Sequence, residues 1–277
     1  MSASPAPLRL RPLEVGDLLD ETFRIYRRHF VLFAGISVIL AIPQAALQGY
    51  GIFTLFSTFL QTINAGQNPD VNSLLPSLIV VAAGTVVALL LSPFTSATVL
   101  YAAAESALGR RVTVGSALRG VLHRYFSILG YLVITFLMAI VFCLFPLWIW
   151  IWVGWVAVLP AMFVENLGLT AAMARSWHLV SGRWWRTFLI IFLILLVVYF
   201  ASIALQAFVG LANGLIGSVV SSYLVLAIGQ GAQVIVAALV NPVLQIAIVL
   251  IYFDLRVRRE ALDLFQLAEQ VSSSQPA

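Results

Sequence analysis

Long uncharged runs alternate with short polar stretches along most of the chain. The hydrocarbon core of a bilayer is about 30 Å thick and needs roughly 20 apolar residues of helix at about 1.5 Å rise each. Six runs meet this requirement, and the pattern therefore predicts an all-α, polytopic membrane bundle of six spans. The predicted spans are Phe30–Tyr50, Leu74–Ala104, Phe126–Phe145, Leu147–Val164, Thr187–Val209 and Tyr223–Tyr252.

Three of the prolines affect how the apolar runs are divided or bent. Pro93 and Pro242 lie inside the long second and sixth runs, where a kink or a tilt is expected. Pro146 separates the third run from the fourth and predicts a tight hairpin there.

The composition supports a membrane location, because 62% of residues are hydrophobic and only 9% are charged, against roughly 25% charged in a soluble domain. We expect a cytoplasmic amphipathic segment over residues 1–29, a transmembrane domain over 30–252 and a cytoplasmic amphipathic tail over 253–277. The first segment is too long and too mixed for a cleaved signal peptide. The chain has a single cysteine, Cys143, so no internal disulfide can form.

The cationic residues gather in four places: the N-terminal segment, residues 110–124, residues 175–186 and the tail. With six spans, these places share one side of the membrane, and the positive-inside bias makes that side cytoplasmic. Both termini are then inside a multi-pass protein of the cell (plasma) membrane. All fifteen cations are arginine, a usage that indicates a bacterial source. Tryptophan indoles prefer the membrane–water interfaces. We therefore expect one group near the outer face, Trp148, Trp150, Trp152 and Trp155, and a second group near the inner face, Trp177, Trp184 and Trp185.

An internal repeat is visible in the order of these features. Ser92-Pro93 is followed twelve residues later by Glu105, Asn241-Pro242 is followed twelve residues later by Asp254, and the fourth span ends at Glu165. An amphipathic stretch rich in aromatic and basic residues precedes each odd-numbered span. We infer three copies of one unit: an interfacial helix, a span out and a span back.

The charged residues at the inner boundary have two interpretations. They pair with one another across the repeats, which is the simpler interpretation, or they bind anionic lipid headgroups. The candidates for ion pairing or headgroup binding are Arg24, Arg27, Arg28, Glu105, Arg110, Arg111, Glu165, Arg175, Arg183, Arg186, Asp254, Arg256, Arg258 and Arg259.

Three stretches, "RPLEVGDLLDETFRIYRRHF", "ENLGLTAAMARSWHLVSGRWWRTF" and "YFDLRVRREALDL", together resemble the glycerophosphoryl diester phosphodiesterase membrane domain family. The resemblance covers nearly the whole chain, with Ala261 at a position where that family often has glycine. It implies a multi-span membrane domain. The family's name comes from members fused to a soluble phosphodiesterase barrel, which this sequence lacks, so the resemblance does not carry that activity over.

No pattern of catalytic or metal-binding residues stands out. The histidines His29, His123 and His178 occupy predicted inner-face positions, and no acid or second histidine stands near them at ligand spacing. We therefore expect no catalytic site, no metal, no cofactor and no enzymatic activity. The arginines follow the membrane boundary, which excludes a nucleic-acid role despite the net charge of +4.

Polar residues on the sixth span are the remaining candidates for function. Gln230, Gln233, Asn241 and Gln245 recur at helical spacings. We expect them to bond helices together; the alternative is that they line a small cavity beside Pro242. The predicted depth of the membrane holds no ionisable residue, which disfavours ion-coupled transport. The preferred interpretation is a non-catalytic membrane module that binds lipid or partner proteins, and the alternative is a transporter or permease-like carrier of an uncharged or lipid-like solute.

Overall fold

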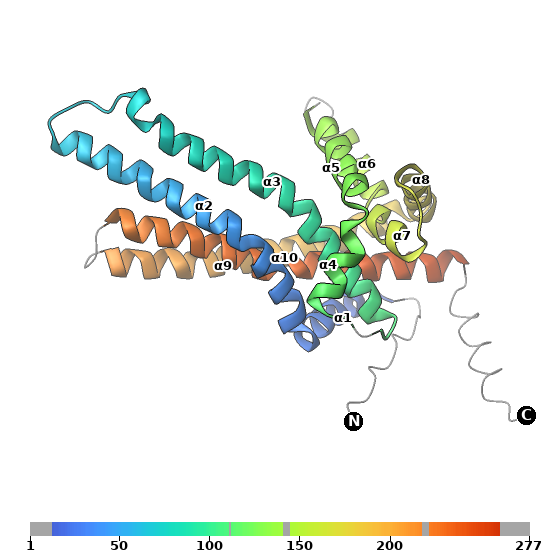
Figure 1. Ribbon diagram of the computed structural model, residues 1–277. Helices are drawn as coiled ribbons and strands as arrows, with labels where there is room; N and C mark the ends of the chain where they lie inside the picture. Colours follow the sequence, from blue (N-terminus) through green and yellow to red (C-terminus); the bar gives the residue numbers. More distant parts are fainter. Residues whose placement is uncertain (1–12, 111, 141–144, 218–221, 261–277) are drawn as a thin grey trace, which may run out of the picture.

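The structure, a computed structural model, describes residues 13–110, 112–140, 145–217 and 222–260, and these residues form helices without any strand (Figure 1). The fold class is thus all-α, as the hydrophobic pattern predicts. The helices are α1 (Val15–Arg28), α2 (Phe30–Asn64), α3 (Val71–Ala107), α4 (Val114–Leu122), α5 (Tyr125–Ile140), α6 (Phe145–Gly154), α7 (Val158–Val164), α8 (Leu169–Val180), α9 (Trp184–Gly217) and α10 (Ser222–Glu260). Arg111 and Cys143 lie outside the described residues.

Five helical segments of the described chain are long and apolar enough to cross a membrane, which indicates a multi-pass membrane protein. They are Phe30–Asn64, Val71–Ala107, Leu147–Val164, Trp184–Gly217 and Tyr223–Glu260. The third predicted span is not among them, because α5 has 16 residues, about 24 Å of helix at 1.5 Å per residue. The fourth is bent, since a turn at residues 155–157 separates α6 from α7. Six full spans are therefore not found among the described residues, and residues 141–144 of the third predicted span lie outside them.

The order of elements occurs three times along the chain. A short helix is followed by two apolar helices in α1–α2–α3 and again in α8–α9–α10, and the middle copy is α4, α5 and the pair α6–α7. The outer copies contain helices of 34 to 39 residues. Those of the middle copy have between 7 and 16 residues. The repeat inferred from the sequence is thus present with a much shorter middle unit.

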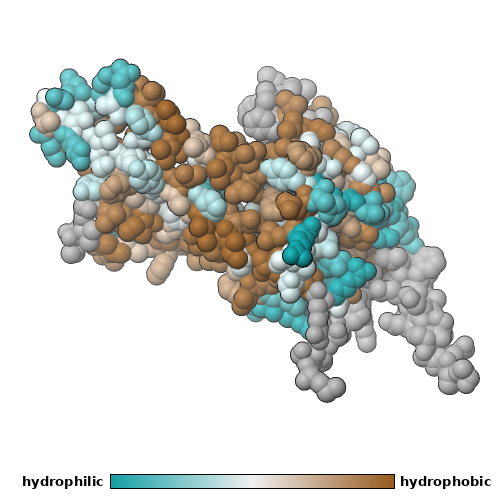
Figure 2. Space-filling view, viewed as in Figure 1, coloured by the Kyte–Doolittle hydropathy of each residue, from teal (hydrophilic) through white to brown (hydrophobic). Residues whose placement is uncertain are grey.

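The long helices extend past the predicted spans at the end opposite α1. The sequence places the end of the first span at Tyr50, whereas α2 continues to Asn64 and α3 begins at Val71. A helix of 35 residues is about 50 Å long, which exceeds the hydrocarbon core. Figure 2 shows hydrophobic surface along the long helices, with hydrophilic residues at the α2–α3 turn and a second hydrophilic region at the opposite end.

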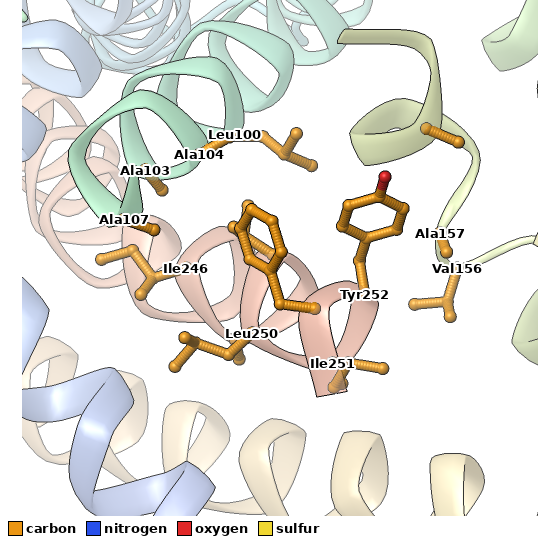
Figure 3. Close-up of a cluster of buried hydrophobic side chains, with 14 of the residues drawn as sticks. Leu100, Ala103, Ala104, Ala107, Val156, Ala157, Ile246, Leu250, Ile251 and Tyr252 are labelled. Carbon is orange, nitrogen blue, oxygen red and sulfur yellow. The ribbon is translucent and has the colours of Figure 1, made fainter. Parts of the chain in front are cut away.

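The core lies at the end where the three units meet. Tyr252 and Leu250 of α10 pack with Leu100 and Ala104 of α3, and the turn residue Ala157 reaches the same cluster (Figure 3). Small alanines on α3, including Ala103 and Ala107, let α10 approach closely. The middle unit packs on α3, α10 and α9 at this end and is therefore held between the outer units.

The tryptophans do not divide between two membrane faces as expected. The rings of Trp150 in α6 and Trp177 in α8 pack edge to face with centroids 4.5 Å apart. The Trp184 indole N–H donates to the Trp150 carbonyl at 3.0 Å. Trp150 therefore lies beside two residues assigned to the opposite face, so the expected division of the tryptophans between two faces is wrong for Trp150. The cause is the short middle unit, because α6 packs along the start of α9 instead of leading to a far interface.

Candidate functional site

A cavity of about 460 Å³ lies between the four long helices. Its polar lining residues on α2 and α3 are Ser37, Gln44, Ser92 and Thr95. On α9 and α10 they are Ser202, Gln206, Gln230, Gln233 and Asn241. Leucine, valine and alanine side chains complete the lining, which contains no charged residue. We call this cavity the groove.

The packing of the helices explains where the groove lies. α2 and α10 pack along much of their length: a Cβ atom at Gly49 would lie 3.1 Å from the Ala227 carbonyl oxygen. α3 packs on α2 and α9 packs on α10, but α3 and α9 share no extensive contact in the described part of the chain. α2 and α10 thus form the floor of the groove, and α3 and α9 form its walls. The middle unit joins these walls only near the inner end, where α5 meets α3 and α6 meets α9.

Ser37 is the most unusual residue of the lining. It is 1% exposed, and its hydroxyl has no hydrogen-bond partner in the described structure. Buried helical hydroxyls elsewhere bond back to the carbonyl four residues earlier, as Thr98 does to Phe94 at 2.7 Å. A buried polar group without a partner costs about 1–3 kcal/mol. The Ser37 hydroxyl is therefore a buried group without a partner among the described residues, at the edge of the groove.

Two prolines adjoin the groove from different helices. Ser92 and Asn241, each followed by a proline, are exposed residues of its lining. Pro242 has no N–H to donate to the Ala238 carbonyl, which belongs to the lining as well. The next carbonyl, that of Leu239, accepts a hydrogen bond from the Tyr26 hydroxyl at 2.5 Å. The proline thus leaves one carbonyl at the groove without its usual helical donor.

The polar residues expected on the sixth span fall into two groups. Gln230, Gln233 and Asn241 line the groove, as the cavity alternative predicts. Gln245 is 8% exposed and lies outside the lining. Gln230 also donates to the Gln48 side chain of α2 at 3.3 Å, so the helix-bonding interpretation describes this residue too.

The carboxylates Glu105, Glu165 and Asp254 each meet an arginine, and Asp254 has the most buried site. Its side chain is 1% exposed and lies 2.5 Å from Arg186 and 2.9 Å from Arg258. Both arginines also donate to the Leu13 carbonyl at 2.7 Å. The Leu13 N–H donates to Asp254 at 2.9 Å. This cluster joins the chain before α1 to the third unit.

Glu165 is the centre of a second cluster between α7, α8 and α10. It lies 2.8 Å from Arg175 and 3.6 Å from Arg256, and it accepts a hydrogen bond from the Tyr252 hydroxyl at 2.8 Å. Arg175 also pairs with Glu260, which pairs with Arg256 at 3.1 Å. Burial lowers the pKa of Arg175, but hydrogen bonds and charges from Glu165 and Glu260 outweigh burial, so the pKa is raised. Arg175 therefore remains charged.

The remaining charged candidates are closer to solvent. Glu105 pairs with Arg110 at 3.0 Å, and the Arg110 side chain is 66% exposed. Arg24 pairs with Glu21 on α1, where Arg27 and Arg28 are exposed. Arg183 donates to the Arg258 carbonyl at 3.2 Å, and Arg259 donates to the Ser181 carbonyl at 2.7 Å. Each of the three units thus has an acid, Glu105, Glu165 or Asp254, that pairs with an arginine. The arginines do not occupy equivalent positions in the three units, and the pairs differ in burial.

Several residues of these sites were not predicted from the sequence, among them Ser37, Arg124 and Glu260. Ser37 shares a face of α2 with Gln44 and Gln48, at spacings of seven and eleven residues, and this spacing was the signal for it. Arg124 donates to the carbonyls of Met162 and Leu167 at 2.8 Å each. No local pattern indicates that pairing, because it joins α4 to the end of α7.

No group of three or more metal-ligating side chains comes together among the described residues. A comparison of the chain with protein-family models, with curated proteins and with solved structures finds no match. The family resemblance stated from the sequence stays a prediction.

Proposed function

We propose that this chain is a non-catalytic membrane module that binds a lipid-like molecule in the groove. The observation that carries the proposal is a cavity between the four long helices that is lined by uncharged polar groups and by apolar side chains. A ligand with both a polar and an apolar part makes favourable contacts with both kinds of lining.

The depth of the groove favours a ligand that comes from the bilayer. Ser37 and Gln44 lie on the second to fourth turns of α2, about 10–20 Å along the helix from its start. That depth is near the middle of a hydrocarbon core of about 30 Å. Since α3 and α9 lie apart, the route into the groove runs between two helices with lipid-facing side chains. A molecule already dissolved in the bilayer reaches such a site without crossing water.

Filling the groove tests the proposal. Ala41 belongs to the lining, whereas Ala46 is an exposed residue of the same helix outside it. Native mass spectrometry of protein purified from its membrane should detect a retained lipid-like molecule in the wild type and in Ala46→Phe, and its loss in Ala41→Phe. Equal retention by the two variants, or no retained molecule in the wild type, would contradict the proposal.

A carrier of an uncharged or lipid-like solute is the second candidate. The observation that favours it is that three helices with an internal proline, α2, α3 and α10, line the groove, since helices weakened in this way form substrate sites in many transporters. Flux of a neutral solute into liposomes that contain the protein, abolished by Ala41→Phe, would favour the carrier over the module.

We infer from the arginine distribution that the termini and the end carrying α1, α4 and α8 face the cytoplasm of a bacterial cell. The exposed arginines of α1, Arg27 and Arg28, are the best placed to meet anionic headgroups of the plasma membrane, because they have no acid partner in the described structure. A membrane protein partner is compatible with the same surface.

A further inference from the structure

We propose that the groove selects a lipid whose polar group is uncharged and carries hydrogen-bond donors, and that it rejects anionic lipids. This inference rests on the proposed function, because it names the chemical class of the ligand bound there. It separates the groove from the inner-face arginines, which attract anions.

The absence of charge in the lining is the first argument. The polar atoms around the groove belong to amides and hydroxyls. The nearest acid on α10, Asp254, follows Asn241 by thirteen residues, about 20 Å of helix. An anionic group moved to this depth has no counter-charge to replace its hydration, and burial of an unpaired charge is strongly unfavourable.

The balance of donors and acceptors is the second argument. The Ala238 carbonyl lacks its usual helical donor, and the side-chain amides of Gln233 and Asn241 each present an oxygen acceptor as well as N–H donors. The Ser37 hydroxyl donates or accepts. A carboxylate or a phosphate offers mainly acceptor oxygens, which leaves these acceptors unsatisfied. A neutral group with hydroxyl and amide N–H groups satisfies both kinds of partner.

The apolar part of the lining is the third argument. Leu40, Leu91, Val198 and Val234 line the same groove. Such side chains favour a hydrocarbon chain beside the polar group. The ligand class is therefore an amphiphile with a neutral head, and not a free sugar or a free amide.

Two lipids that differ in one group test this inference. N-oleoylethanolamine and N-oleoylglycine share the acyl chain and the amide, but the first ends in a hydroxyl and the second in a carboxylate. Binding of each is measured by native mass spectrometry with the detergent-purified full chain. We expect N-oleoylethanolamine to bind at least about tenfold more tightly, which corresponds to roughly 1.4 kcal/mol.

Variants assign the binding to the groove. Gln233→Leu and, separately, Asn241→Leu should each weaken N-oleoylethanolamine binding by about fivefold or more, as expected for the loss of a hydrogen bond at a buried site. Ser57→Ala is the matched control, because Ser57 is on α2 outside the lining and bonds to the Thr54 carbonyl at 3.1 Å. It should bind like the wild type. Unchanged binding in both groove variants would overturn the inference.

The two proposals fail in different ways. Tighter or equal binding of N-oleoylglycine that is lost in Ala41→Phe would overturn the neutral-head inference and leave the proposed function standing. Binding of both lipids that is insensitive to Ala41→Phe would overturn both proposals. Binding of N-oleoylglycine that survives Ala41→Phe but is lost in the Arg27→Gln, Arg28→Gln double variant belongs to the inner face and agrees with the inference.

Discussion

At the level of single residues, burial decides which charges and hydroxyls matter for stability. Asp254 is 2% exposed and holds two arginines and a backbone N–H, whereas the partner of Glu105 is mostly in solvent. Ser37 and Ser176 are both buried serines, but only Ser176 has partners. These contrasts between residues of one type give two predictions with internal controls.

Asp254→Asn should lower the melting temperature in detergent strongly. It leaves two partly buried guanidinium groups without a carboxylate, and removing one partner of a buried pair costs about 3–5 kcal/mol. The lower end of that range applies because the side chains of Arg186 and Arg258 are 25% and 26% exposed. Glu105→Gln is the control and should cost about 0–1 kcal/mol, as for a solvated pair. Equal decreases in melting temperature for Asp254→Asn and Glu105→Gln would contradict the prediction that the buried ion pair stabilises the protein more than the exposed one.

Ser37→Ala should leave the melting temperature of ligand-free protein unchanged or raise it by an amount equivalent to up to about 1 kcal/mol, because it removes a hydroxyl that has no partner. Ser176→Ala, the same substitution, should destabilise the protein by about 1–3 kcal/mol. The Ser176 hydroxyl donates to the Gly154 carbonyl at 2.8 Å and accepts from the Ala157 N–H at 3.1 Å. A clear decrease in the melting temperature of Ser37→Ala would show that the Ser37 hydroxyl has a hydrogen-bond partner.

At the level of helices, close approach at glycine sets the spacing of α2 and α3. A Cβ atom at Gly51 would lie 2.7 Å from a Val81 methyl carbon and 3.1 Å from the Val81 backbone nitrogen. At Gly35, on the same helix, a Cβ atom would meet nothing within 4 Å. The two glycines therefore differ in their role although both are helical.

Gly51→Ala should destabilise the protein by about 1–3 kcal/mol, the usual cost of forcing extra volume into a packed contact. Gly35→Ala should stabilise it by up to about 1 kcal/mol, since alanine has the higher helix propensity. Thermal unfolding in detergent measures both changes. If Gly51→Ala is as stable as Gly35→Ala, α3 does not approach α2 as closely as described.

At the level of the whole molecule, the repeat sets both the topology and the opening of the groove. The middle unit, α4 to α7, begins and ends near the same end of the bundle. The predicted orientation of the two outer units in the membrane is therefore the same whether or not α5 crosses the bilayer completely. The middle unit is also too short to join α3 and α9 beyond the inner end, and the groove lies where that connection is lacking.

Cysteine labelling tests the sidedness. Asn68, in the α2–α3 turn, and Arg119, on α4, are both exposed. In a Cys143→Ser background, Asn68→Cys should react with an impermeant thiol reagent in intact cells, and Arg119→Cys should react only after permeabilisation. The reverse result would invert the topology derived from the positive-inside bias.

The sequence alone determined the helical elements, because hydropathy and amphipathic periodicity are properties of each segment by itself. Their sidedness stays a prediction from arginine placement. The sequence predicted the all-α class, the repeat, the pairing of Glu105, Glu165 and Asp254 with arginines, and the polar face of α10. It did not predict the turn at residues 155–157 that divides the fourth span into α6 and α7, because apolar composition does not show where a helix bends.

Only the tertiary structure decided which residues form the groove. Gln48 and Gln230, which bond across its floor, are 182 positions apart in the chain. Ser37 looks ordinary in the sequence and is distinctive only because its surroundings bury it without a partner. The physical reason is that a cavity depends on the distances between helices, and these distances follow from contacts between distant segments, such as the close approach of α2 to α10 and the separation of α3 from α9.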